Sequence, residues 1–332
     1  MTQSDRDIVV STRVRLARSL DGLLFPTKMS HDQEIELNQR IEKRINGNGD
    51  FQSYRMSELD GVERQVLVER HVASAELVNK PNAMLLLSRD EKISLLVGEE
   101  DHLRIQSVLP GLSLDKADEL TRSIDNILSA EGYAYDEQYG YLTACPTNVG
   151  TGMRASVMLH VPALKSTGQL RSLAENINKF GYTIRGYYGE GSSVEGDMFQ
   201  LSNQVTLGVS EDEILDGLTQ LLRSIITKER QLRDALLKND SGALSDRLHR
   251  SLGILKYARR IRSNEMMERL SDIRLGLSLN LFDGVRYEDI EQLEQKMQPA
   301  SILSVVGHNA TSEQRDEARA AAVRLALKDC HF

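Results

Sequence analysis

The apolar pattern of this chain changes once, near residue 210, and that change constrains the fold more than any other feature. Before it, the segments 92–98 and 155–162 alternate between apolar and polar residues, which predicts strands with one buried face. Further strands are expected at 83–88, 139–144, 182–188 and 199–207, and a helix is expected at 112–129. Because strands and helices do not alternate regularly, we expect an α+β fold in which helices flank an antiparallel sheet.

From Ser210 onward the sequence has the pattern of nearly continuous helix. Ser210 and Glu213 have the spacing of a capping box, and the apolar residues that follow recur at intervals typical of a helix. Further helices are expected at 244–262, 264–276, 287–297 and 311–327. We therefore expect two domains, a mixed one over residues 1–228 and a helical one over residues 229–332.

Composition argues against several classes of protein. A net charge of −8 over 332 residues disfavours a nucleic acid or an anionic membrane as the partner. The two cysteines, Cys145 and Cys330, form neither a disulfide framework nor a zinc-site spacing. The N-terminal segment lacks a basic stretch followed by an apolar one, and no run of about 18 apolar residues occurs. We expect a cytoplasmic protein without a membrane span.

Three arginines, Arg13, Arg15 and Arg18, follow a β-rich start in the segment 7–18, DIVVSTRVRLAR. On a strand, Arg13 and Arg15 project from the same face, so their guanidinium groups can converge on one anion. An edge strand with solvated charges is the alternative interpretation.

Three consecutive carboxylates, Glu99, Glu100 and Asp101, follow the strand expected at 92–98, in the segment GEEDHLR. They repel one another unless a cation lies against them, and a cationic substrate or a metal ion would supply one. A solvated acidic turn fits the same residues.

The segment 141–156, YLTACPTNVGTGMRAS, connects two expected strands through a loop that contains Cys145. Gly150 and Gly152 permit close approach of the backbone. The P-loop pattern GxxxxGK[ST] is absent from the chain, so phosphates would need another mode of binding. A hairpin loop with a buried cysteine also fits.

The segment 184–196, IRGYYGEGSSVEG, places Arg185 near a strand end and Glu190 between two glycines. A carboxylate flanked by glycines suits a loop that closes over a substrate. A mobile surface loop is equally consistent with this pattern.

In their order along the chain, STRVRLAR, EEDHLR, CPTNVGTGMRASV and RGYYGEGS resemble the motifs of the phosphagen kinases, the creatine and arginine kinase family. The resemblance covers about the first 210 residues. It implies the catalytic fold of that family, which is glutamine synthetase-like. It also implies a kinase that transfers the γ-phosphoryl group of ATP to a guanidinium group.

Two departures from the small-molecule enzymes of that family resemble the bacterial protein arginine kinases instead. The small-molecule enzymes carry a helical domain before the first arginine motif, which here begins at Ser11, and they have His where this sequence has Gly191. More loosely, the segment 315–320, RDEARA, matches the RDxxRA motif of protein arginine kinases. Arginine in other proteins is therefore the expected acceptor.

By this resemblance, arginines from all four motifs would hold the phosphates of ATP, and His71 would lie near the adenine. Mg²⁺ would accompany the nucleotide, with Glu99 as a candidate for an outer-sphere contact and no direct protein ligand predicted. The residues assigned to nucleotide binding are Ser11, Thr12, Arg13, Val14, Arg15, His71, Arg104, Arg154, Ala155, Ser156, Val157, Met158, Arg185, Gly186, Tyr187, Tyr188, Gly189 and Glu190.

The resemblance also assigns catalytic roles. Glu100 and Glu190 would hold the acceptor guanidinium, and Glu190 would take its proton. Because the pKa of a free Glu lies about 8 units below that of Arg, deprotonation has to accompany formation of the N–P bond. Cys145 would approach the guanidinium as an electrostatic helper and not as a nucleophile.

The resemblance further implies regulation and partners. Arg315, Asp316, Arg319 and Ala320 would belong to a regulatory phosphoarginine pocket, although a surface helix with ordinary charge pairs fits the same residues. Members of this family dimerise and act on proteins in the stress response, together with the zinc-binding adaptor McsA and the Clp unfoldase and protease. A homodimer and these partners are expected here.

Two other functions remain open at this point. The first is a kinase for free arginine or another small guanidino compound. The second is a noncatalytic phosphoarginine reader or protease adaptor that uses the RDEARA segment. The presence of both glutamates and all five arginines of the site favours a kinase over the reader.

Overall fold

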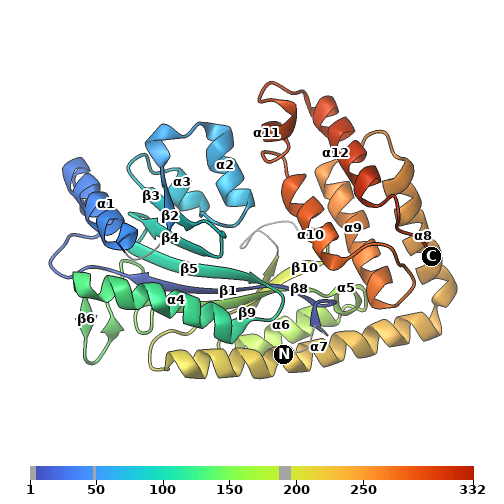
Figure 1. Ribbon diagram of the computed structural model, residues 1–332. Helices are drawn as coiled ribbons and strands as arrows, with labels where there is room; N and C mark the ends of the chain where they lie inside the picture. Colours follow the sequence, from blue (N-terminus) through green and yellow to red (C-terminus); the bar gives the residue numbers. More distant parts are fainter. Residues whose placement is uncertain (1–4, 48–49, 187–195) are drawn as a thin grey trace. The chain divides into compact units, whose positions relative to one another are not determined.

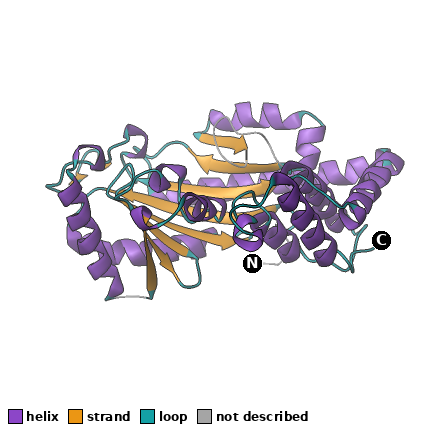
Figure 2. Ribbon diagram, turned by 90° about the horizontal axis from the view of Figure 1, so that it is seen from above, coloured by secondary structure: helices purple, strands orange, loops and turns teal. Residues whose placement is uncertain are grey.

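The computed structural model of the chain describes residues 5–47, 50–186 and 196–332. Its main feature is an eight-stranded sheet with the order β2-β3-β4-β5-β1-β8-β10-β9 (Figures 1 and 2). The strands are β1 (Val9–Arg18), β2 (Phe51–Arg55), β3 (Met84–Ser88), β4 (Ile93–Val97), β5 (Leu103–Pro110), β8 (Met153–His160), β9 (Tyr182–Gly186) and β10 (Met198–Asn203). Neighbours from β2 through β5 to β1 pair antiparallel, and helices flank the sheet. The expected α+β fold is confirmed.

The chain divides into two compact units, which we describe separately. The sheet unit comprises Ser11–Val157 and Ser202–Thr219. The helical unit comprises Met1–Val10, Met158–Leu201 and Gln220–Phe332.

Helices cover both faces of β3 and β4 in the sheet unit (Figure 1). The longer pair, α1 (His31–Asn46) and α4 (Leu114–Leu128), packs against one face, where Leu86 and Leu95 are buried. The shorter pair, α2 (Gly61–Glu69) and α3 (Ala75–Val78), packs against the other face, where Leu85 and Leu96 are buried. The alternating pattern of 92–98 predicted one buried face, but β4 is buried on both because each face meets its own helices.

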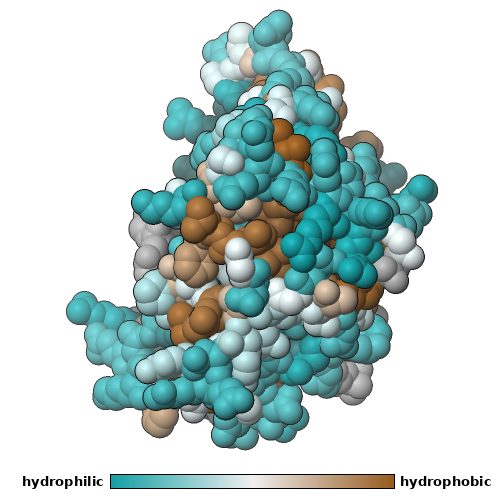
Figure 3. Space-filling view, turned by 90° about the vertical axis from the view of Figure 1, so that its left-hand side faces the viewer, coloured by the Kyte–Doolittle hydropathy of each residue, from teal (hydrophilic) through white to brown (hydrophobic). Residues whose placement is uncertain are grey.

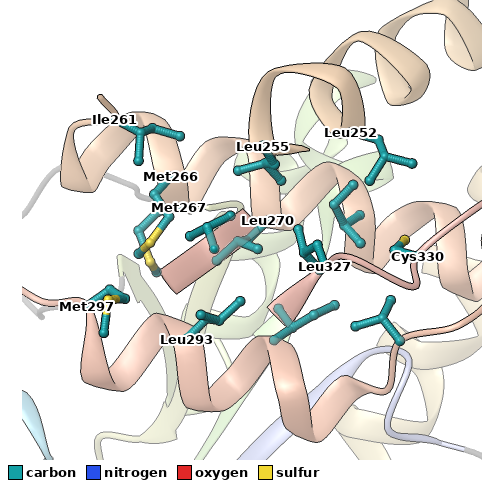
Figure 4. Close-up of a cluster of buried hydrophobic side chains, with 14 of the residues drawn as sticks. Leu252, Leu255, Ile261, Met266, Met267, Leu270, Leu293, Met297, Leu327 and Cys330 are labelled. Carbon is teal, nitrogen blue, oxygen red and sulfur yellow. The ribbon is translucent and has the colours of Figure 1, made fainter. Parts of the chain in front are cut away.

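Four helices of the helical unit enclose a single apolar core (Figure 4). They are α8 (Ser241–Tyr257), α9 (Ser263–Ser278), α10 (Tyr287–Lys296) and α12 (Ser312–Ala326). The core contains Met267 and Leu270 of α9, which are fully buried. These four helices confirm the helices predicted at 264–276, 287–297 and 311–327 and most of the one predicted at 244–262, which ends at Tyr257.

The long helix α7 (Glu211–Asn239) begins at the predicted capping box. The N–H of Glu213 donates to Ser210 Oγ at 3.1 Å, and the N–H of Ser210 donates to Glu213 Oε2 at 2.7 Å. The helix continues through residue 228, so the boundary that the sequence predicts there lies inside α7. The division into domains over 1–228 and 229–332 stays a prediction.

The strand predicted at 139–144 is wrong over most of its length. Only β7 (Gly140–Tyr141) forms there, and it pairs with β6 (Tyr135–Asp136). Beyond it, the N–H of Ala144 donates to the side chain of Asp101 at 2.6 Å and is not available to a strand partner. A tertiary contact therefore replaces the strand.

Apolar side chains gather among hydrophilic ones on the face drawn in Figure 3. The exposed apolar residues of the sheet unit include Leu23, Leu24 and Phe25, which follow β1. His102 holds this segment, because its Nε2 lies 2.8 Å from the carbonyl oxygen of Leu24 and its ring stacks on Phe25. The segment 23–25 is thus attached to the turn that carries the acidic motif, which consists of Glu99, Glu100 and Asp101.

Candidate functional site

Arginines of two distant motifs share one face of the sheet unit. Arg13 and Arg15 are partly exposed on β1, whereas the residues between and beside them are buried on the opposite face. In the antiparallel pair with β5, Ala17 lies opposite Arg104, which places Arg104 on the face of the two β1 arginines. The sheet register therefore brings Arg104 to the first motif.

A fourth arginine, Arg154 of β8, joins this cluster. Its Nη2 donates to Ser202 Oγ at 3.0 Å. Burial, followed by the charges of Arg104, Arg154 and Arg13, lowers the pKa of Arg15 well below its ordinary value, while Glu99 opposes that shift. Guanidinium groups that repel one another in this way are stabilised when a polyanion lies among them. We call Arg13, Arg15, Arg104 and Arg154 the arginine cluster.

Glu99 is buried beside the arginine cluster. Its Oε1 accepts from Arg104 Nη1 at 2.5 Å and also from Ser74 Oγ. Its Oε2 is buried and has no hydrogen-bond partner among the described residues. Because such an oxygen costs free energy when no donor reaches it, it marks a position where a cation or its bound water could be accommodated.

The other two carboxylates of the acidic motif have different surroundings. The side chain of Glu100 is 44% exposed, and its Oε2 lies 3.8 Å from Arg104 Nη2. Asp101 is buried and accepts hydrogen bonds from the neighbouring loop. Of the three, Glu100 is therefore the one whose carboxylate an incoming cation can reach.

His71 lies close to the arginine cluster. Its backbone has a left-handed φ of 59°, and its carbonyl oxygen accepts from Gln106 Nε2 at 3.1 Å. Burial, with a smaller contribution from Arg13, lowers the pKa of His71 to about 3. The ring is therefore neutral at physiological pH; its expected contact with adenine stays a prediction.

The His71→Gln variant is expected to lose less free energy of unfolding than the wild type as the pH falls. Folded His71 stays neutral down to about pH 3, whereas the unfolded residue takes a proton near pH 6.5. The unfolded state binds more protons between these values, so this contribution to stability is complete above about pH 6.5 and declines as the pH falls toward 3. In urea unfolding without nucleotide, the wild type should lose up to about 1 kcal/mol per pH unit more than His71→Gln.

The control for this prediction is His31→Gln, at an exposed position of α1. That variant should keep the slope of the wild type. Equal slopes for His71→Gln and the wild type would contradict a neutral His71 in the folded protein.

Cys145 lies in a loop over residues 141–150, which we call the cysteine loop. Hydrogen bonds join its two ends and hold its middle. Tyr141 and Gly150 exchange two backbone hydrogen bonds, and the single hydroxyl proton of Thr206 is shared between the carbonyl oxygens of Thr147 and Val149, at 3.0 and 2.8 Å from Oγ1. The Sγ of Cys145 is 3.0 Å from Thr147 Oγ1, and the residue is partly exposed. The sequence expected close backbone approach at the glycines, and at Gly150 the structure confirms it.

Gly150→Ala is expected to lower the free energy of unfolding by more than about 2 kcal/mol. The φ of Gly150 is +111°, and an added Cβ would lie 2.1 Å from the carbonyl oxygen of Thr206. Gly208→Ala is the matched comparison, because Gly208 has a φ of +77° but open space around an added Cβ. It should cost about 1 kcal/mol, the left-handed backbone penalty alone. Chemical denaturation measures both values, and equal losses would contradict the close packing of the loop on Thr206.

Arg18, the third arginine of the first motif, has a structural role that the sequence did not reveal. It is buried, and its Nε and Nη2 donate to the two carboxylate oxygens of Asp125 at 3.1 and 3.0 Å. Its guanidinium lies 3.6 Å from the centre of the Tyr141 ring. Arg18 therefore links β1 to α4 and to Tyr141 at the start of the cysteine loop. Its side chain lies on the face of β1 opposite to Arg13 and Arg15.

Several other predicted residues lie outside the arginine cluster. Ser11, Thr12 and Val14 are in β1, and Ala155, Ser156 and Val157 are in β8. Met158, Arg185 and Gly186 belong to the helical unit. Tyr187, Tyr188, Gly189 and Glu190 lie outside the described residues. Their nucleotide contacts stay predictions.

The RDEARA segment forms part of α12, which begins with a capping box formed by Thr311 and Gln314. Arg319 is buried; it donates to the carbonyl oxygens of Met297 and Ile261 at 2.9 Å and to Asp316 at 2.6 Å. Ala320 is buried beside it. In this structure the carboxylate of Asp316 is thus paired with the guanidinium of Arg319.

No three His, Cys, Asp or Glu side chains of the described segments form a group that could hold a metal ion. In the same segments, no helix has the length and apolar character needed to span a membrane.

Comparison with known proteins defines the class. The family model "ATP:guanido phosphotransferase, C-terminal catalytic domain" matches residues 33–232. The duplicated taurocyamine kinase of Schistosoma mansoni, solved with bound transition state analog components, aligns with a TM-score of 0.62 at 30% identity over 68% of this chain and 33% of that one. Lombricine kinase shares the fold, with a TM-score of 0.63 at 23% identity over 70% of this chain and 68% of that one. The family model and the shared fold are those of an ATP:guanido phosphotransferase.

Two further findings narrow the class. The model "Protein-arginine kinase McsB C-terminal domain" matches residues 241–331. The protein-arginine kinase of Caldanaerobacter subterraneus subsp. tengcongensis is 41% identical over 98% of this chain and 99% of its own length. That of Brevibacillus brevis is 44% identical over 98% of this chain and 93% of its own. The chain belongs to the protein-arginine kinase family, which confirms the resemblance seen in the motifs.

Proposed function

We propose that this protein transfers the γ-phosphoryl group of ATP to the guanidinium group of arginine residues in other proteins. The observation that carries this proposal is the arginine cluster, in which four guanidinium groups lie close enough to lower the pKa of Arg15 and so favour the binding of a polyanion. Membership of the protein-arginine kinase family supports protein arginine as the acceptor. Phosphoryl transfer requires mainly positioning of the reactants and neutralisation of charge, which such a cluster can provide.

The nucleotide would bind on the face of the sheet that carries the arginines of β1 and β8. Arg13, Arg15, Arg104 and Arg154 would hold the phosphate oxygens as permanently charged forks and so replace the P-loop that the chain lacks, with Arg185 as the fifth arginine. The backbones of residues 11–15 and 154–158 and the segment 185–190 would lie alongside. A neutral His71 suits an uncharged base such as adenine.

Mg²⁺ would accompany ATP, and the residues present are compatible with it. The buried Oε2 of Glu99, which lacks a hydrogen-bond partner in the described chain, can accept from a water bound to the ion. Phosphate oxygens and water would supply the other ligands, as is usual for Mg²⁺ bound together with a nucleotide. When bound, the ion neutralises charge on the phosphates.

The acceptor arginine would be held by Glu100 and Glu190. Glu100 is exposed enough to receive a guanidinium beside Arg104, and Glu190 would take the proton as the N–P bond forms. Since a free carboxylate is far weaker as a base than arginine's conjugate base, proton removal and bond formation have to be concerted. Cys145 would act as an electrostatic helper near the guanidinium.

Regulation and location are further parts of the proposal. Arg315, Asp316, Arg319 and Ala320 would form a phosphoarginine pocket on α12, and binding there would require Asp316 to exchange its contact with Arg319. We propose a cytoplasmic homodimer with a catalytic domain over 1–228 and a helical domain over 229–332. It would act with the zinc-binding adaptor McsA and mark proteins for the Clp unfoldase and protease in the stress response.

Competition between acceptors tests the proposal. The protein is incubated with Mg·ATP and equal arginine concentrations supplied as casein and as free arginine, and the products are analysed by mass spectrometry at a pH that preserves P–N bonds. Phosphoarginine in casein is the expected product. Phosphorylated free arginine alone would instead indicate a small-molecule kinase, and the absence of both products would indicate a phosphoarginine reader.

A further inference from the structure

Asp101 is a buried carboxylate whose hydrogen bonds lead to the cysteine loop. It is 3% exposed. Its Oδ1 accepts from the N–H of Ala144 at 2.6 Å and from Ser19 Oγ at 3.0 Å, and its Oδ2 accepts from Asn148 Nδ2 at 3.4 Å. The carboxylate thus binds the loop at the residue before Cys145 and again three residues after it.

The contact from the N–H of Ala144 is stronger than an ordinary loop contact. An ionised carboxylate that accepts from a backbone N–H forms a charge-assisted bond, about twice as strong as a neutral one. The bond from Ser19 also ties the carboxylate to the segment that leaves β1. Within the loop, Thr143 Oγ1 donates to the carbonyl oxygen of Cys145 at 2.8 Å, so displacement of residue 144 would be transmitted to Cys145.

Asp101 is also the residue after Glu100, the carboxylate proposed to receive the acceptor arginine. The turn that carries both is closed by the N–H of Gly98, which donates to the carbonyl oxygen of His102 at 3.0 Å. His102 is fully buried, and its Nδ1 accepts from the N–H of Leu20 at 3.0 Å. A rigid turn therefore carries Glu100 and, through Asp101, fixes the cysteine loop.

We propose that Asp101 is a positioning residue. Its hydrogen bonds to the cysteine loop hold Cys145 at a fixed position relative to Glu100, where the acceptor arginine would bind. The acidic motif then has three separate tasks, since Glu99 holds Arg104, Glu100 faces the substrate and Asp101 holds the cysteine loop. The inference rests on the proposed function for its catalytic consequence, but the hydrogen bonds predict an effect on the Cys145 thiol that is independent of any activity.

A double-mutant cycle with Cys145→Ala tests the proposal. Asp101→Ala should lower kcat for casein phosphorylation by about 10-fold or more, with the KM for ATP unchanged, because the nucleotide is held by other residues. In the Cys145→Ala background the same substitution should change kcat by less than about 2-fold. Asp101→Asn should recover much of the activity, because its amide oxygen can still accept from Ala144. Equal losses in both backgrounds would overturn the proposal.

The second readout is alkylation of Cys145 by iodoacetamide in the nucleotide-free protein, followed by mass spectrometry of its peptide. Loosening the loop should make alkylation several-fold faster in Asp101→Ala and, to a smaller extent, in Asn148→Ala, which keeps the stronger bonds. Buried Cys330 gives the internal reference for global unfolding. An unchanged alkylation rate at Cys145 in both variants would overturn the proposal even if the enzyme proved to use another acceptor.

Asp60→Ala is the matched control. Asp60 also accepts two backbone hydrogen bonds, from Val62 and Glu63 at 2.8 Å, but it caps α2. Its loss should lower stability by about 1 kcal/mol and leave alkylation of Cys145 unchanged. If Asp60→Ala accelerated alkylation as much as Asp101→Ala, general destabilisation and not positioning would explain the effect, and the proposal would be wrong.

Discussion

Arg15→Met is expected to weaken ATP binding by at least about 100-fold and, in the same protein, to raise the free energy of unfolding without nucleotide by about 1–3 kcal/mol. Burial and the charges of Arg104, Arg154 and Arg13 destabilise the charged form of Arg15 and lower its pKa. Methionine replaces the aliphatic part of the arginine side chain and carries no charge, so it removes this repulsion. The same substitution removes a guanidinium group that would bind the phosphates, so ATP binding is expected to weaken.

Calorimetric titration with Mg·ATP and chemical denaturation measure the two effects. Arg171→Met is the control, because Arg171 is an exposed residue of α6 (Gln169–Asn178) that pairs with Glu175 at 3.2 Å. It should change both quantities little. A lower free energy of unfolding for Arg15→Met would contradict the proposal that like charges in the arginine cluster destabilise the protein when no nucleotide is added.

Glu190→Ala is expected to lower the rate of phosphoarginine formation by at least about 1,000-fold, with ATP affinity within about 2-fold of the wild type. The expectation follows from the motif resemblance, in which Glu190 aligns the acceptor and takes its proton. Rapid-quench measurement of transferred phosphate, together with nucleotide titration, separates the two quantities.

The control for this prediction is Glu175→Ala, at an exposed carboxylate of α6. It should keep the wild-type rate. Near-normal transfer by Glu190→Ala would remove Glu190 from the chemistry and leave Glu100 as the carboxylate that orients the acceptor.

The local part of the candidate site was predictable from the sequence. The two-residue period of a strand puts Arg13 and Arg15 on one face without knowledge of any other element. The capping boxes at Ser210 and Thr311 were predictable for the same reason, since each depends on residues three positions apart.

The remainder depends on contacts between distant segments. Arg104 lies near Arg15 because of the register of β5 on β1, and the residue pattern of 103–110 did not predict a strand. Arg18 carries the same charge as its neighbours in the motif, but its partner Asp125 lies on α4. Residues close in sequence thus acquired different roles because their partners come from elsewhere in the chain.

Asp101 illustrates the same limit for the acidic motif. Three adjacent carboxylates in a sequence suggest a shared cation, since like charges repel. In the fold, the three are separated by burial and by the donors that reach them, and only the surroundings of Glu100 suit a cationic substrate. The strand predicted at 139–144 was wrong because Asp101 takes the N–H of Ala144.

The chemical nature of the transferred phosphate shows whether the proposed reaction takes place. The wild type, Arg15→Met and Glu190→Ala are incubated with Mg²⁺ and γ-labelled ATP and with casein, and the labelled casein is divided between acid and neutral treatment. We predict label on casein with the wild type alone, released by acid as expected for a P–N bond and located on arginine by mass spectrometry. Label that survives acid, or label that persists at the wild-type level in both variants, would contradict the account.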